Sequence, residues 1–137
     1  MKEVSDRLYV VTDDGSEGQK GFANEILKGL LESGEKFDLV YGVGAATLMR
    51  TVAEVTKPFD VKTIVSLNAL MIDGTGLCGC CRVTVGGKTK FACVDGPEFD
   101  AHLVDFDEFR AKIHMYDPEQ REALELYGRD KDAKARS

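Results

Sequence analysis

The sequence predicts an α/β fold, with a parallel sheet in its first half and a small β-hairpin module that carries all four cysteines. Two observations lead to this prediction. Short apolar, β-branched runs alternate with segments whose apolar residues recur at helical spacing, which is typical of parallel strands joined by right-handed crossovers. After residue 68 this pattern gives way to two short runs around Gly86-Gly87, a dipeptide that favours a tight hairpin turn.

The expected elements follow from local patterns. Asp13-Asp14-Gly15 ends the first apolar run, and Lys57-Pro58 ends the second helix, because proline disfavours helical geometry in the residue before it. The C-terminal residues 117–137 are highly charged, and we expect fraying from residue 129 onward. In chain order we predict a strand at 8–12, a helix at 22–31, a strand at 37–41, a helix from 42–44 to 57, strands at 61–67, 82–85 and 88–92, and a helix at 119–126.

Composition restricts the partners and the compartment. A chain of 137 residues with 43% hydrophobic content is long and apolar enough for one folded domain. A net charge of −6 without a basic patch argues against nucleic acid as a partner. No apolar run approaches the ~20 residues of a membrane span, and the first residues are too polar for a signal peptide. We therefore expect a reducing, cytoplasmic compartment, where clustered thiols more often bind metal than form disulfides.

The cysteines form a metal-binding pattern. Asp73, Cys78, Cys81 and Cys93 have the spacing D-x4-C-x2-C-x11-C. Plant-type iron–sulfur proteins hold a [2Fe–2S] cluster with C-x4-C-x2-C…C, and Asp73 stands where that pattern has its first cysteine. A carboxylate can replace one thiolate without changing the total ligand charge. Cys80 lies between two candidate ligands and is interpreted as a buried packing residue.

Two alternatives remain open from the spacing alone. Asp73-Gly74 is also a common turn dipeptide, so Asp73 could serve the turn rather than the metal. A zinc site made of three cysteines and His102 is the other alternative. Zinc sites usually carry two Cys-x-x-Cys pairs, however, and this chain has one. The pattern therefore favours iron–sulfur over zinc.

Three segments make the chain resemble a known family: residues 10–21, residues 41–49 and residues 73–97. It looks like the C-terminal part of the iron–sulfur flavoprotein electron-transfer subunits related to ferredoxin–NADP reductase. These include the dihydroorotate dehydrogenase electron-transfer subunit, the soluble hydrogenase gamma subunit, and the small subunit of sulfide dehydrogenase or NADH-dependent ferredoxin:NADP oxidoreductase. The last group resembles the chain most, and the resemblance covers most of residues 6–112.

The resemblance implies a division of the chain and a set of site residues. Residues 1–67 would be the C-terminal half of a Rossmann-like NAD(P)-binding domain, 68–112 the [2Fe–2S] module, and 113–137 a charged helix or tail. The group that resembles the chain most uses an aspartate ligand at the position of Asp73. Ala45 stands where the family usually has proline. The positions that match the family's nucleotide site are Asp13, Asp14, Gly15, Gly42, Val43 and Gly44.

The function implied by the resemblance is electron transfer. The intact protein would be an oxidoreductase subunit that relays electrons between NAD(P)H, FAD and a larger catalytic partner subunit through the [2Fe–2S] cluster. The family's flavin domain and its first nucleotide-binding βα unit are not in this chain, so we expect a fragment that is inactive alone. A sheet without its first strands exposes an edge, so we also expect the fragment to pair with a second copy as a homodimer. The competing hypotheses are a non-catalytic zinc-binding structural module and a nucleotide-sensing domain.

Overall fold

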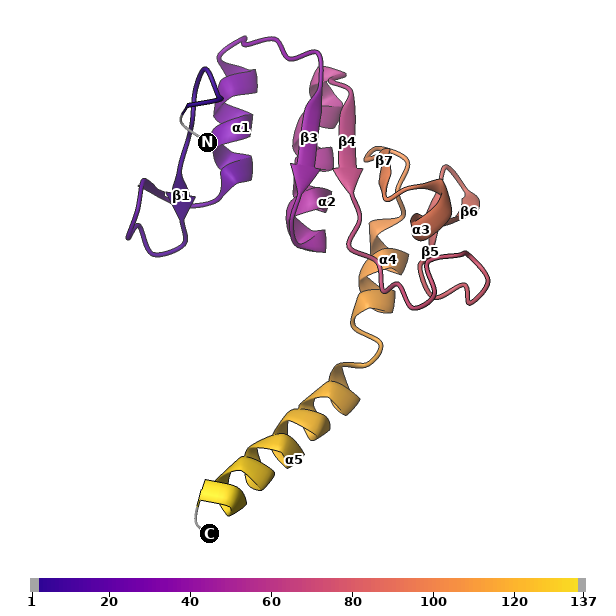
Figure 1. The fold of residues 1–137 in the computed structure, drawn as a ribbon. Helices are drawn as coiled ribbons and strands as arrows, with labels where there is room; N and C mark the ends of the chain where they lie inside the picture. The colour runs from indigo at the N-terminus through magenta and orange to yellow at the C-terminus, as the bar shows by residue number, and fades with distance from the viewer. Residues whose placement is uncertain (1–2, 136–137) are drawn as a thin grey trace.

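The computed structural model describes the backbone of residues 3–135 and the side chains of residues 3–128 (Figure 1). The first half contains β1 (Val11–Thr12), β2 (Gln19–Lys20), α1 (Ala23–Glu32), β3 (Val40–Val43), α2 (Ala46–Thr56), the 3-10 turn η1 (Lys57–Phe59) and β4 (Thr63–Ser66). The second half contains β5 (Arg82–Val85), β6 (Lys88–Phe91), α3 (Ala92–Asp95), β7 (Glu98–Asp100), α4 (Phe106–Ile113) and α5 (Asp117–Ala135).

A three-stranded sheet lies at the centre of the fold. β3 and β4 run parallel, and β7 pairs antiparallel with β4, so the strand order is β3-β4-β7. The crossover helix α2 covers one face of this sheet and packs against α1. Its buried residues include Met49 and Val52, while Val65 of β4 is fully buried beneath it. Burial of this apolar stripe, rather than helix propensity, holds α2 in place.

The hydrophobic core runs from the sheet into the cysteine-rich region. Met49 of α2 and Val65 of β4 share one cluster of buried side chains with Cys81, Val83 and Phe109. The β5–β6 hairpin is attached to the same body through Val85, which bridges Val104, and through the N–H of Gly86, which donates to Leu103. The predicted boundary at residues 67 and 68 is therefore crossed by a continuous core.

The α/β class is confirmed, although the sheets are smaller than expected. The first predicted strand does not join the central sheet. Among residues 3–135, β1 pairs only with β2, in parallel, and the apolar run before Val11 forms no ladder. β7 was not predicted, since a three-residue segment with two acidic side chains has no strand-like pattern. The helix expected at 119–126 extends through Ala135, so fraying from residue 129 is not what the backbone shows.

Candidate metal centre

The three cysteines of the pattern come from two segments that the hairpin brings together. Cys78 and Cys81 lie at the end of the loop between β4 and β5, and Cys93 lies in the short helix α3 that follows β6. The Sγ atoms of Cys81 and Cys93 are 3.3 Å apart, and the N–H of Cys93 also points to the Cys81 sulfur at 3.5 Å. Cys81 is only 2% exposed. Residues twelve positions apart in sequence thus form one sulfur pair.

Asp73 lies against Cys78 within the same loop. One carboxylate oxygen accepts the N–H of Cys78 at 2.7 Å, and the other accepts the N–H of Thr75 at 2.9 Å. The Thr75 N–H, followed by that of Cys78, holds the pKa of Asp73 below its usual value. The carboxylate therefore stays ionised at neutral pH. Asp73 accepts the N–H of Thr75, as a turn residue does, and it also lies next to the candidate ligand Cys78. A role in the turn and a role as a metal ligand are therefore compatible.

Backbone N–H groups surround the candidate sulfur ligands. The N–H of Cys80, followed by that of Asp73, lowers the pKa of the Cys78 thiol. A hydrogen bond with the Cys81 thiol raises the pKa of Cys93, whereas the N–H of Gly76 acts in the opposite direction. Hydrogen bonds to sulfur favour the thiolate, which is the form that binds iron. The loop therefore presents donors to the atoms that would carry negative charge in a metal site.

Gly76 is required by the shape of this loop. Its φ of +83° lies in the left-handed region, and a Cβ at this position would come within 2.9 Å of the Val94 Cγ2 atom. Only glycine adopts such a conformation without strain. The loop backbone thus passes close to α3 at the residue next to Cys93.

The candidate ligands are arranged as two pairs. Asp73 adjoins Cys78, and Cys81 adjoins Cys93. Among the residues whose side chains the structure describes, no three or more His, Cys, Asp or Glu side chains converge as they would around one metal ion. Two thiolates on one tetrahedral metal, with bonds of about 2.3 Å, lie about 3.8 Å apart. The 3.3 Å separation of the Cys81 and Cys93 sulfurs is close to that value.

His102 is engaged elsewhere in the fold. Its Nε2 atom lies 3.0 Å from the hydroxyl of Thr56 in α2, and its backbone N–H donates to Asp100. The pocket that His102 lines contains no cysteine. The structure therefore gives no support to a zinc site of three cysteines and His102.

Cys80 differs from the packing residue that the sequence suggested. It is only half-buried, and a hydrogen bond with the Cys78 thiol raises its pKa. The position of Cys80 between two candidate ligands did not indicate how exposed the loop is. Cys80 also lines a small pocket of about 170 Å³ with Cys78, Leu70, Lys112 and Tyr116.

The residues expected to contact a nucleotide follow β1 and β3. Asp14 accepts the N–H of Ser16 at 2.9 Å, and this bond holds the pKa of its carboxyl below the usual value. Gly42 lies within β3, and Gly44, with φ +156°, precedes α2. A Cβ on Gly44 would meet Leu48 at 2.6 Å. Both segments lie at carboxyl ends of strands, where open α/β sheets bind ligands, but β1 and β3 belong to different sheets.

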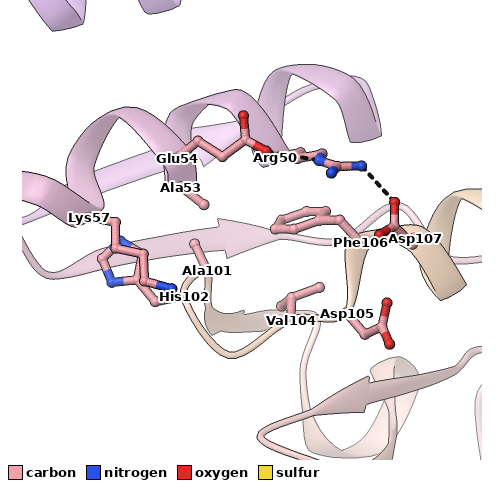
Figure 2. Close-up of a pocket in the computed structure, with 10 residues that line it drawn as sticks. All are labelled: Arg50, Ala53, Glu54, Lys57, Ala101, His102, Val104, Asp105, Phe106 and Asp107. Atoms are coloured by element: carbon pink, nitrogen blue, oxygen red, sulfur yellow. Dashed lines mark hydrogen bonds and ion pairs between the residues drawn. The ribbon is translucent and has the colours of Figure 1, made fainter.

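A pocket that the sequence did not reveal lies between α2 and the segment after β7 (Figure 2). It has a volume of about 240 Å³. Arg50 crosses its rim and bonds Glu54 at 2.9 Å and Asp107 at 2.6 Å. His102, which also lines the pocket, lies 3.0 Å from the Thr56 hydroxyl, and the buried Thr63 hydroxyl donates to Thr56, 2.7 Å away. No sequence pattern marks the Arg50–Asp107 bond, since it joins residues fifty-seven positions apart. This bond ties α2 to α4.

Comparison with known proteins matches the cysteine region to a family. Residues 68–105 match the model of the iron–sulfur cluster binding domain of dihydroorotate dehydrogenase B. The chain is 44% identical over 127 residues to the Thermotoga maritima dihydroorotate dehydrogenase B (NAD(+)) electron transfer subunit homolog, covering 93% of this chain and 44% of that protein. The predicted resemblance is confirmed. The name of this relative describes an electron transfer subunit homolog, which agrees with the function expected from the sequence.

Two further proteins are similar to this chain. An uncharacterized protein from the adh 3′ region of Clostridium beijerinckii is 48% identical over 124 residues, covering 90% of this chain and 42% of that protein. The solved structure of NADH-dependent reduced ferredoxin-NADP oxidoreductase contains a chain that superposes with a TM-score of 0.80 at 42% identity, covering 91% of this chain and 45% of that one. The chain therefore spans less than half the length of these relatives. No helix in the described residues is both long and apolar enough to cross a membrane.

Proposed function

We propose that this chain is part of an electron-transfer subunit of an oxidoreductase, and that Asp73, Cys78, Cys81 and Cys93 hold a [2Fe–2S] cluster. The observation that carries the proposal is the juxtaposition of these residues in two pairs, Asp73 with Cys78 and Cys81 with Cys93. Two irons with two protein ligands each suit this arrangement better than a single zinc ion, which needs four ligands in one tetrahedron. When bound, such a cluster accepts and donates single electrons.

The chain's own residues provide the environment of the site. The N–H groups of Gly76 and Cys80 point to candidate ligand sulfurs, where they stabilise thiolate charge. Cys81 and the neighbouring Val83 are buried in the core and keep water from one side of the loop. The other side is open, because Cys78 is exposed. A loop that is buried on one side and open on the other fits electron exchange with a second protein.

The remaining parts of the function involve more than this chain. In the intact subunit, FAD and NAD(P) would supply the electrons, and a larger catalytic subunit would exchange them with the cluster. We place the NAD(P) contacts of this chain at Asp13-Asp14-Gly15 and Gly42-Val43-Gly44, in a Rossmann-like domain that residues 1–67 share with other polypeptide. The four free thiols suit a cytoplasmic compartment.

The test is the metal content of protein purified without oxygen. We expect about two irons and two sulfides per chain, with the visible absorption of a [2Fe–2S] centre. An Asp73→Cys variant should keep this composition, because a thiolate preserves the ligand charge. Colourless protein with one zinc per chain would contradict the proposal and would favour the structural zinc module instead. Reconstitution with iron and sulfide distinguishes protein that has merely lost its cluster from protein that cannot bind one.

A further inference from the structure

Arg82 lies where the cysteine loop turns into β5. It begins the strand directly after the candidate ligand Cys81. Its backbone N–H donates to the C=O of Gly79 at 3.3 Å, and Nη1 of its guanidinium donates to the same C=O at 3.2 Å. Gly79 follows the candidate ligand Cys78 and has φ +66°. One residue therefore gives two hydrogen bonds to the backbone of the Cys-x2-Cys loop.

The backbone of Arg82 is held in turn by α4. This helix packs against β5, and Lys112 of α4 donates to the C=O of Arg82 at 3.0 Å. Lys112 also bonds one oxygen of Glu108, whose other oxygen accepts the N–H of Thr84 at 3.1 Å. Phe109 anchors α4, because it is buried in the core. The Arg82 side chain thus extends over the loop from a backbone that both β5 and α4 fix in place.

The guanidinium of Arg82 carries a positive charge that no carboxylate neutralises. Arg82 lines one small pocket with Cys78 and Cys80. Lys112 is the other cation of that pocket, and its charge is paired with Glu108. Among the residues whose side chains the structure describes, no ion pair includes Arg82, whose side chain bonds a neutral carbonyl instead. The charge is therefore available beside Cys78, the exposed member of the candidate ligands.

A cation at this place would act on the redox equilibrium of a bound cluster. All four candidate ligands are anions when they bind iron, so an added electron enters a centre that is already rich in negative charge. A nearby positive charge stabilises the reduced form more than the oxidised form and raises the reduction potential. The chain as a whole has a net charge of −6, which acts in the opposite direction. Arg82 thus offsets the charge of its own protein at the site.

We propose that Arg82 is a positioning residue of the metal centre: it holds the Cys-x2-Cys loop through Gly79, and its unpaired charge raises the reduction potential of the cluster. The proposal rests on the [2Fe–2S] assignment under Proposed function and adds a residue outside the ligand set. The alternative is that Arg82 only closes the local turn, as its backbone N–H does. A turn residue would contribute to stability, but its charge would not change the potential.

A redox titration of the full chain, purified without oxygen and reduced with dithionite, tests the role of the charge. Arg82→Met and Lys88→Met each remove one positive charge, but Lys88 lies at the turn end of the hairpin, paired with Val85. Arg82→Met should lower the equilibrium constant for one-electron reduction on the order of tenfold, a shift of about 59 mV. Lys88→Met should leave the potential near that of the unaltered protein.

Two further measurements separate charge from hydrogen bonding. Arg82→Lys keeps the charge and should keep most of the potential. Because Arg82 is exposed, high salt should reduce the difference between the unaltered protein and Arg82→Met. Equal potentials in Arg82→Met and Lys88→Met, or a loss in Arg82→Lys as large as that in Arg82→Met, would overturn the proposal. Arg82→Gln is a second neutral variant for the titration if the methionine variant does not retain iron.

Unfolding of the metal-free protein tests the hold on the loop without iron. Arg82→Met should lower the unfolding midpoint more than Lys88→Met does, because the Gly79 carbonyl loses a donor. Equal midpoints would overturn this part of the proposal. Zinc in place of iron in the unaltered protein would refute the cluster assignment and the role of the charge with it, whereas the midpoints would still decide whether Arg82 holds the loop.

Discussion

Gly76→Ala tests whether the loop must pass this close to α3 for the metal site to form. The first cost is backbone strain, since φ at Gly76 is +83°. Placing a residue with a Cβ in the left-handed region costs about 1–2 kcal/mol. The second cost is steric, because the new Cβ would lie 2.9 Å from Val94 Cγ2. Val94 is β-branched and must leave its rotamer to give way, which costs about 0.5–1.5 kcal/mol.

The chain offers a control for the strain alone. Gly87 in the hairpin turn has φ +72°, and a Cβ there would meet nothing within 4 Å. Both substitutions reduce the freedom of the unfolded chain equally, so that contribution cancels in the comparison. We expect Gly87→Ala to lower the free energy of unfolding by about 1–2 kcal/mol. Gly76→Ala should lower it by about 0.5–1.5 kcal/mol more.

Val94→Ala isolates the steric part. Val94 is 60% exposed, so its truncation alone should change stability little. Combined with Gly76→Ala, it should recover the extra loss but not the strain, which is a measurable coupling in a double-mutant cycle. Denaturant unfolding of the metal-free protein gives the free energies, and iron retention against a chelator reports the site. Equal losses in Gly76→Ala and Gly87→Ala, or no recovery with Val94→Ala, would refute the reasoning.

Three further predictions concern the site and its support. Asp73→Ala should make the cluster labile while Cys80→Ser leaves it intact; iron retained in the first and lost in the second would mean a four-cysteine site. Thr63→Val should lower the free energy of unfolding by about 1 kcal/mol, because the buried hydroxyl bonds Thr56 and Val61, whereas Thr63→Ser should cost less. Lys112, followed by Thr84, holds the pKa of Glu108 below its usual value. The ionised Glu108 therefore stabilises the fold at pH values above its unfolded-state pKa, and this stabilisation is lost as the pH falls through its folded-state pKa. Glu108→Gln should therefore flatten the acid side of a stability–pH curve, and an unchanged acid side would show that Glu108 does not contribute.

Local patterns predicted the elements that local chemistry determines. Apolar spacing placed α1 and α2, and Gly86-Gly87 placed the strands on either side of it within one residue. The spacing of Asp73, Cys78, Cys81 and Cys93 identified residues that the fold brings together in pairs. In these cases the information that predicts the structure lies in residues close together in sequence. For Cys81 and Cys93, it lies in the number of residues that the hairpin places between them.

The elements that could not be predicted depend on distant partners. β7 exists as a strand because Phe99 pairs with Val65, thirty-four positions earlier, and its own residues carry no strand pattern. The bonds from His102 to Thr56 and from Arg50 to Asp107 likewise join segments that no periodicity connects.

The prediction of a strand at residues 8–12 in the parallel sheet was wrong for a different reason. Residues 8–12 have the apolar pattern of a strand within a sheet, and the pattern predicts pairing on both sides. Only β2 pairs with it among the described residues. A strand pattern records the neighbours that a segment requires, whether or not the chain itself contains them. Val11 is accordingly only half-buried, because a two-stranded ribbon covers less of an apolar strand than the central sheet would.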